Sequence, residues 1–141
     1  RGPTTRESPR QIDQGQGLSV EADYEASETR SLWYRRAARL FETYDALALP
    51  SAQVWPFPAD WRWPEEIADR KMDTYHRWME IVVPVSLAGL PCLGMPAGFS
   101  QSGLPMGMQL FGPTGSDAAL LAMGDAYHQA TDWPNACPPA L

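Results

Sequence analysis

Few side chains in this sequence have the chemistry of a nucleophile or a general base, and no local motif brings them together. The histidines are His76 and His128, and the cysteines are Cys92 and Cys137. A nucleophilic hydrolase needs a Ser, Cys or Thr beside a base that a third group orients. A hydrolase using Cys92 or Ser86 with His76 would need a tertiary arrangement that no motif indicates. We therefore interpret both histidines as helix-surface side chains.

Metal and anion sites are equally weakly indicated. Cys92 and Cys137 form no CxxC pair and have no histidine cluster nearby, so we expect two reduced thiols rather than a zinc site or a disulfide framework. The loop Gly112–Ser116 precedes a predicted helix but lacks the lysine of a P-loop and the GxGxxG spacing, which favours a turn and cap. The acidic side chains before and within the predicted middle helix have no metal-binding spacing; they are Glu65, Glu66, Asp69 and Asp73.

Aromatic residues are concentrated between positions 50 and 64. This stretch holds three tryptophans, Phe57 and four prolines. Prolines at this density exclude a regular helix or central strand. A loop so rich in aromatic side chains must pack back on the protein or line a cavity.

The helices and strands that must position this loop can be predicted from periodicity. A helix is expected over residues 19–43, capped by Ser19, with an apolar stripe that includes Trp33 and Phe41. Its other face carries arginines at 35, 36 and 39, which could be a basic recognition surface but are interpreted as a solvated face. The short apolar run 45–49 is expected to be a central strand covered on both faces.

A second helix is expected to begin at Pro64 and to carry Met72, Tyr75, Met79 and Val82 at helical spacing. Pro84 should interrupt or restart it, with Gly89 as a left-handed cap. Two strands are then expected, Cys92–Met95 and Met106–Phe111, joined as a hairpin by the loop Pro96–Pro105. Ser116 and Asp117 should open a last helix whose buried side holds Leu120, Leu121, Gly124 and Tyr127.

Composition restricts the classes of protein to consider. The chain has 141 residues, 11 basic and 17 acidic, a net charge of −6 and 44% hydrophobic residues, as in one globular domain. The acidic balance disfavours a nucleic-acid partner, and no apolar run is long enough to cross a bilayer. No starting Met or signal peptide is present, so we expect the chain to begin inside something longer. We divide it into a flexible lead-in (1–17), a main portion (18–131) and a proline-rich tail (132–141).

Four segments together resemble a known family. They are YDALALP at 44–50, WRWPEEIADRKMDTYHRWM at 61–79, GLPCLGMPAGF at 89–99 and GLPMGMQLFGP at 103–113. The first, third and fourth are similar to the C-terminal segment of the amidase signature family, serine hydrolases of amide bonds, and the second resembles the same region in one branch of that family. The resemblance covers residues 14–131, and the tandem of GLP-led strands is its most specific part.

The resemblance implies an α/β fold, a mixed sheet covered by helices, of which this chain holds only the C-terminal part. The family uses a Ser, a second Ser in a cis peptide and a Lys, all in the N-terminal part; Lys71 lies in the wrong segment, and we assign no catalytic residue here. It also implies a small amide substrate, no cofactor or metal, and a bacterial, cytoplasmic enzyme. We expect this chain alone to be inactive and to self-associate. The expected pocket wall consists of Trp55, Phe57, Trp61, Tyr75, Trp78 and Met79.

One alternative comes from a different class. The chain could be a non-catalytic remnant or binding module whose aromatic loop holds a small apolar ligand or a protein partner.

Overall fold

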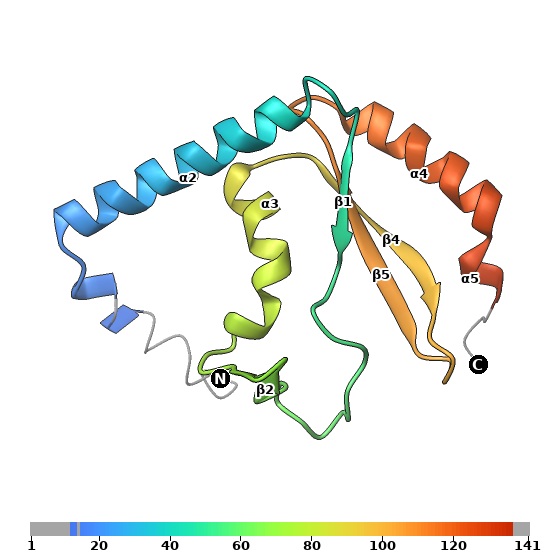
Figure 1. Ribbon diagram of the computed structural model, residues 1–141, viewed down its shortest axis with the longest axis horizontal. Helices are drawn as coiled ribbons and strands as arrows, with labels where there is room; N and C mark the ends of the chain where they lie inside the picture. Colours follow the sequence, from blue (N-terminus) through green and yellow to red (C-terminus); the bar gives the residue numbers. More distant parts are fainter. Residues whose placement is uncertain (1–11, 14, 137–141) are drawn as a thin grey trace, which may run out of the picture.

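The computed structural model describes residues 12, 13 and 15–136 and has an antiparallel sheet at its centre. The strands of this sheet are β1 (Leu47–Pro50), β4 (Cys92–Phe99) and β5 (Pro105–Phe111). Their spatial order is β1-β5-β4. Figure 1 shows α2 (Val20–Leu40) and α3 (Val83–Ala88) on one side of the strands and α4 (Asp117–Thr131) on the other. This confirms the predicted α/β class, with helices covering a sheet.

A mixed sheet contains both parallel and antiparallel strand pairs, but the described strands of this sheet pair only in the antiparallel direction. β5 pairs antiparallel with both β1 and β4. A parallel pair needs a long crossover connection, whereas β4 and β5 are joined by a short hairpin loop. The parallel neighbours that a mixed sheet implies are therefore absent from the described strands.

The first predicted helix is confirmed with a shorter C-terminal end. α2 covers Val20–Leu40, and the Ser19 hydroxyl accepts a hydrogen bond from the Ala22 amide at 3.2 Å. Trp33 fixes the helix to α3, because its Nε1–H donates to the Pro84 carbonyl at 2.7 Å. The helix ends at Leu40, and the next residue, Phe41, meets Phe111 edge-on with ring centroids 6.2 Å apart.

β1 is a strand, as predicted, but it is not central within the described sheet. It has one neighbour, β5, and its exposure alternates: Leu47 and Leu49 are half-buried, whereas Ala48 and Pro50 are exposed. α4 packs on β4, and Ala48 on β1 stays exposed. The expectation of cover on both faces is wrong for these residues.

Both hairpin strands are confirmed and are longer than predicted. β4 continues beyond Pro96 to Phe99, with an irregularity between Pro96 and Gly98, and β5 begins at Pro105. β4 is an edge strand, where a proline without an amide hydrogen removes no hydrogen bond to another strand. The connecting loop is therefore shorter than the predicted Pro96–Pro105 loop.

The helix predicted to begin at Pro64 is wrong. The chain instead forms a small antiparallel hairpin of β2 (Glu66–Ile67) and β3 (Arg70–Lys71). Between these strands Ala68 and Asp69 have φ angles of 49° and 60°. Two consecutive left-handed residues are typical of a two-residue hairpin turn, and a right-handed helix cannot pass through them.

Helical structure begins later, and its expected interruption is confirmed. A 3₁₀ helix, η1, covers Arg77–Val82, and α3 continues from Val83 with Pro84 in its first turn. Proline is tolerated there because the amide hydrogen that it lacks would have no partner within the helix. Gly89 ends α3 with a φ of 65°, the left-handed conformation expected from the sequence.

The last helix packs on β4 through small and apolar residues. Leu120 is 3% exposed, and Gly124 lies so close to the Leu93 side chain that a Cβ there would collide with it. Leu121 is 62% exposed, contrary to the prediction that it shares the buried side of this helix. Adjacent helical residues are about 100° apart, so Leu120 and Leu121 do not both face β4.

The two ends of the chain are only partly described. The expected lead-in falls largely outside the described residues, but positions 12, 13, 15 and 16 have helical backbone. The start of the expected tail forms α5 (Trp133–Ala136), and residues 137–141, including Cys137, lie outside the description. The buried apolar side chains among the described residues are Ala37, Met72, Val85, Met95, Phe111 and Leu120.

Candidate functional site: an aromatic groove

The aromatic loop packs against the segment before and within η1 through a series of ring contacts. Phe57 stacks on Trp61 with centroids 6.3 Å apart and meets Trp78 edge-on at 5.5 Å. Trp78 in turn meets Tyr75 edge-on at 6.0 Å. The structure therefore brings together four of the six residues predicted to bind substrate.

A groove of about 420 Å³ lies between the aromatic loop and the far end of the β4–β5 hairpin. Trp55, Phe57 and Trp78 form one wall, and the other wall comes from residues of β4 and β5. Apolar atoms dominate both walls, and the groove is open to solvent. Its complete lining is Ser51, Ala52, Val54, Trp55, Pro56, Phe57, Trp78, Met95, Pro96, Pro105, Met106 and Gly107.

Glycine at position 107 sets the width of the groove at the start of the loop. A Cβ at Gly107 would collide with the Ser51 hydroxyl, and the Ser51 amide donates to the Gly107 carbonyl at 3.0 Å. The absence of a side chain thus lets the loop leave β1 in close contact with β5. This is the close backbone approach for which the sequence favours glycine.

The remaining predicted residues do not line this groove. Trp61 lies in a second, more polar hollow of about 1020 Å³, whose lining also includes Lys71. Tyr75 is 38% exposed and touches Trp63 and Trp78 through its ring, and Met79 is half-buried on η1. The structure therefore places Trp55, Phe57 and Trp78 together in the groove wall. The other three predicted residues lie outside the groove lining.

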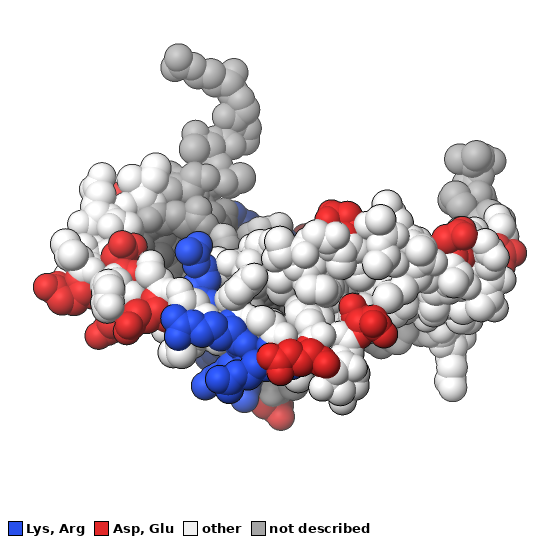
Figure 2. All heavy atoms as spheres, turned by 90° about the horizontal axis from the view of Figure 1, so that it is seen from above, with Lys and Arg blue, Asp and Glu red and all other residues white. Residues whose placement is uncertain are grey.

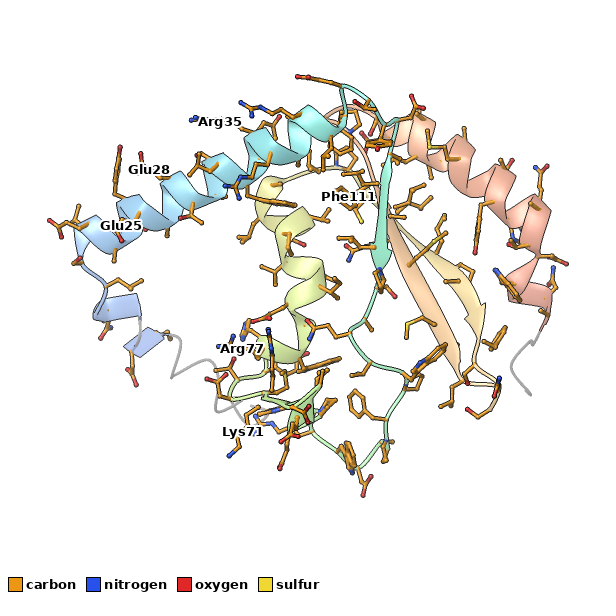
Figure 3. All side chains as sticks on the ribbon, in the orientation of Figure 1. Glu25, Glu28, Arg35, Lys71, Arg77 and Phe111 are labelled. Carbon is orange, nitrogen blue, oxygen red and sulfur yellow. The ribbon has the colours of Figure 1, made fainter. Side chains whose placement is uncertain are left out.

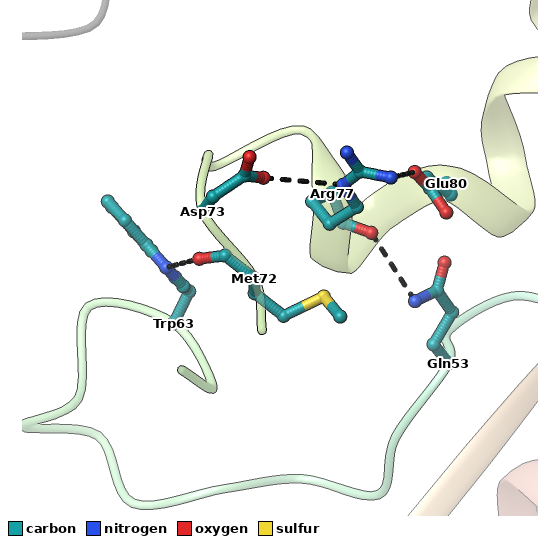
Figure 4. A network of polar contacts seen from close by, with 6 residues as sticks. All are labelled: Gln53, Trp63, Met72, Asp73, Arg77 and Glu80. Atoms are coloured by element: carbon teal, nitrogen blue, oxygen red, sulfur yellow. Dashed lines mark hydrogen bonds and ion pairs between the residues drawn. The ribbon is translucent and has the colours of Figure 1, made fainter. Parts of the chain in front are cut away.

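Hydrogen bonds between side chains and the backbone hold the loop and the η1 segment in place (Figure 4). Gln53 donates from Nε2 to the Arg77 carbonyl at 3.4 Å and accepts from the Ile81 amide at 3.0 Å. Trp63 donates from Nε1 to the Met72 carbonyl at 3.3 Å. These bonds join the two sides of the aromatic cluster independently of the ring contacts.

Gln109 is a positioning residue that the sequence analysis did not identify. Its side chain is buried at 5% exposure, and Nε2 donates to the carbonyls of Pro50 and Ile81, each at 2.9 Å. One amide thereby ties the start of the aromatic loop and the end of η1 to β5. The signal was available, because Gln109 is a polar residue within the otherwise apolar strand that ends at Phe111.

The candidate nucleophiles have no activating surroundings. Burial raises the pKa of the Cys92 thiol, which lowers the fraction of reactive thiolate. Ser86 donates its hydroxyl hydrogen to the Val82 carbonyl at 3.2 Å, an ordinary bond within a helical turn. Within the described residues no cluster of His, Cys, Asp or Glu could hold a metal ion. Neither Cys92 nor Ser86 lines the groove, whose walls are mainly apolar.

Sequence and structure comparisons agree on one family. The Amidase family model matches residues 2–121. This chain belongs to the amidase family. Related sequences include a glutamyl-tRNA(Gln) amidotransferase subunit of Chloroflexus aggregans, 37% identical over 108 residues, and the corresponding subunit of Thermosynechococcus vestitus, 39% identical over 108 residues. Each alignment covers 77% of this chain and 21% of the relative.

Solved amidase structures share the fold. A bacterial aryl acylamidase of the amidase signature family superposes with a TM-score of 0.81 at 23% identity, over 92% of this chain and 27% of that one. A second amidase gives a TM-score of 0.73 at 24% identity, over 90% of this chain and 29% of that one. The chain thus corresponds to the C-terminal part of the amidase fold and spans about a fifth of the curated relatives it matches. None of its described helices could cross a membrane.

Proposed function

We propose that these 141 residues are the C-terminal part of an enzyme that hydrolyses carboxamide C–N bonds. In this proposal they supply scaffold and one wall of the substrate pocket, while the nucleophilic Ser, the cis-peptide Ser and the Lys lie on a segment outside these residues. The parent reaction is acyl transfer from the amide to serine, followed by hydrolysis, with backbone amides holding the oxyanion. The proposal places this enzyme in the cytoplasm.

The observation that carries the proposal is an apolar groove within an amidase fold. Trp55, Phe57 and Trp78 present large apolar surfaces on one side of a groove of about 420 Å³, a volume suited to a small ligand. Such walls bind an aryl or alkyl group through burial of apolar area and ring contacts. We therefore propose an amide with an aryl or bulky alkyl substituent as the substrate class.

The six predicted residues have different places in this proposal. Trp55, Phe57 and Trp78 would contact the substrate directly. Trp61 and Tyr75 would support the wall through their ring contacts with Phe57 and Trp78, and Met79 would pack behind it.

Indole N–H signals in a nitrogen–proton NMR spectrum give a direct test on the 141-residue chain. Titration with acetanilide should shift the signals of Trp55 and Trp78, which line the groove. The signal of Trp33, which is bonded to Pro84 on the far side of α3, serves as an internal control and should stay in place. Acetamide, which lacks the aryl ring, should shift none of them. Equal shifts for all tryptophans, or none up to millimolar acetanilide, would refute binding in the groove.

The binding-module alternative predicts the same groove, but it differs from the enzyme in the coding sequence expected upstream of Arg1. An upstream coding sequence with a Gly/Ser-rich stretch and an earlier lysine supports the enzyme. A start codon directly before Arg1 supports the non-catalytic module.

A further inference from the structure

The outward face of α2 has a charge pattern that the proposed function does not use. The opposite side of the helix is anchored to the protein, since Trp33 bonds to Pro84 and Ala37 is 0% exposed. In Figure 3 the labelled side chains of Glu25 and Glu28 project away from α3, whereas Arg35 also borders a hollow between α2 and the C-terminal end of α3. This outward face is therefore available to another molecule.

Seven positions form one stripe along α2, with a spacing of three or four residues except for Arg35 and Arg36, which are adjacent. The N-terminal half of this stripe is acidic, its C-terminal half is basic, and a leucine lies between the halves. Figure 2 shows acidic side chains gathered at one end of this face and basic ones farther along it. The members of the stripe are Glu21, Glu25, Glu28, Leu32, Arg35, Arg36 and Arg39.

The separation of charge is unfavourable within a single helix. Glu21 and Glu25 repel each other at i,i+4, and so do Arg35 and Arg39. The helix dipole favours acidic residues in the first turn and basic ones in the last, but its effect does not extend to Glu28 in the middle. The dipole therefore does not account for the whole pattern.

The charged side chains of the stripe lack ionic partners within the described residues. All six are exposed, and the ion pairs found there belong to Arg77. Glu28 accepts a hydrogen bond from the Tyr24 hydroxyl at 3.3 Å but contacts no cation. Each half of the stripe is thus free to pair with a charge of the opposite sign on another molecule.

We propose that α2 pairs with α2 of a second copy of this chain in antiparallel orientation, with Leu32 on the two-fold axis. A two-fold pairing centred at Leu32 places residue n opposite residue 64 − n, so Glu28 faces Arg36 of the second copy and Glu25 faces Arg39 of the second copy. Each contact occurs twice, as in every isologous interface. Leu32, which is 51% exposed, meets its own counterpart and loses that exposure.

Charge complementarity selects a second copy in this orientation. A parallel pair would set glutamates against glutamates and arginines against arginines. An acidic or basic partner of uniform charge would complement one half of the stripe and repel the other. A second copy, reversed, pairs Glu25 and Glu28 of each chain with Arg39 and Arg36 of the other over about 21 Å of helix, at 1.5 Å per residue.

Charge reversal on the full 141-residue chain tests the pairing. In 20 mM salt, Glu25→Arg with Glu28→Arg, or Arg36→Glu with Arg39→Glu, should each weaken dimerisation at least tenfold in sedimentation equilibrium. An equimolar mixture of the two variants should form heterodimers, because each chain then presents one sign to the other. Circular dichroism of each variant checks that α2 remains helical.

Matched controls separate this interface from other charges. Glu42→Arg with Asp45→Arg changes the net charge by the same amount as the glutamate variant but lies beyond α2, and should leave dimerisation unchanged. Dimerisation of the unaltered chain should weaken as salt rises from 20 mM to 500 mM, since exposed ion pairs are screened. Failure of the mixed variants to pair, or equal loss in the control variant, would overturn the proposal.

Cross-linking tests the register itself. In a background with Cys92→Ala and Cys137→Ala, Leu32→Cys should be linked to its own counterpart by a short bismaleimide, giving a covalent dimer. Ala38→Cys, exposed on the same helix but outside the stripe, should not be linked. Cross-linking of both variants alike, or of Ala38→Cys alone, would refute pairing about Leu32.

Discussion

At the scale of single residues, Gln109 links both segments that carry the aromatic wall of the groove to β5. Its buried amide bonds to Pro50 and Ile81, which belong to the two segments flanking the aromatic cluster. These two part-buried hydrogen bonds stabilise the protein and hold both segments against β5. An aromatic ring in the cluster contributes apolar surface to the groove wall, whereas the Gln109 amide holds the segments that carry those rings in position.

Gln109→Met should lower the free energy of unfolding by about 1–3 kcal/mol, because it removes two part-buried hydrogen bonds at similar side-chain volume. Urea denaturation followed by circular dichroism measures the loss. Gln101→Met, on the exposed hairpin loop, is the matched control and should change little. Equal effects at both positions would mean that the hydrogen bonds of Gln109 contribute nothing specific.

The cap of α2 offers a second test at residue scale. Ser19→Ala removes the acceptor for the Ala22 amide and should cost about 1 kcal/mol. Ser27→Ala, on an exposed position of the same helix, should be close to neutral. Thermal and urea unfolding curves of the two variants provide the comparison, and indistinguishable curves would argue against a stabilising cap.

The same cap predicts a pH dependence. The backbone amide of Glu21 and the Ser19 side chain lower the pKa of the Glu21 carboxyl below its ordinary value of 4.5. A lowered pKa in the folded state stabilises the protein above pH 4.5, and this contribution is lost as the pH falls through the lowered value. An NMR titration should show the Glu21 pKa rising in the Ser19→Ala variant. No change would mean that the hydroxyl does not stabilise the carboxylate.

At the scale of elements, the sequence predicts structure best where capping and periodicity agree. Ser19 opens α2 and Gly89 closes α3, each by local chemistry that depends on few other residues. The hairpin at residues 66–71 was missed because apolar spacing from Met72 onward resembles a helix, while the turn is fixed by backbone geometry at Ala68 and Asp69. Local signals are reliable only where no tertiary contact opposes them.

The aromatic cluster shows the same limit at the candidate site. Proline density correctly predicts an irregular loop around Trp55, and the helical segment near Trp78 is correctly expected to approach it. Which rings line the groove could not be predicted, because this depends on the position of the β4–β5 hairpin and on long-range bonds such as those of Gln109.

The contact between α4 and β4 depends on a residue without a side chain. Gly124→Val should destabilise the protein by about 1–3 kcal/mol, since a Cβ at this position would collide with Leu93 and approach the Met95 sulfur at 3.2 Å. Ala122→Val, exposed on the same helix, introduces the same side chain without the collision. Urea midpoints compare the two variants, and a harmless Gly124→Val would show that α4 can shift freely on the sheet.

At the scale of the whole molecule, large apolar side chains are exposed among the described residues. Leu32 is 51% exposed, Leu87 is 55% exposed and Leu121 is 62% exposed. One edge of β1 has no neighbouring strand in the described sheet. Unpaired edges and uncovered faces favour self-association.

We therefore expect a second, apolar mode of association that persists at 500 mM salt, unlike the pairing of α2. Light scattering over a wide concentration range should show mass above the monomer, and Ala48→Lys on the exposed face of β1 should reduce it. Asp117→Lys, at the exposed start of α4, is the control. A monomer at all concentrations in high salt would rule out this mode.

The catalytic behaviour expected of the isolated chain follows from the surroundings of its candidate nucleophiles. Apolar walls bind and orient a substrate, but amide hydrolysis needs a nucleophile activated by a base. Cys92 has a raised pKa, and the Ser86 hydroxyl is bonded to a backbone carbonyl. Neither group is therefore activated. Removal of an enzyme's catalytic residues typically lowers the rate of its reaction by several orders of magnitude.

The isolated 141-residue chain should therefore show no turnover of aryl or aliphatic amides, even where NMR detects acetanilide in the groove. A colorimetric assay for released amine, run at high protein concentration, measures this. Cys92→Ala and Ser86→Ala serve as controls: turnover that either substitution abolishes would reveal a nucleophile within the chain and contradict the prediction. Turnover unaffected by both would come from a contaminating enzyme, since neither candidate nucleophile would then carry it. Binding without turnover is the result that separates the wall of a pocket from the catalytic machinery facing it.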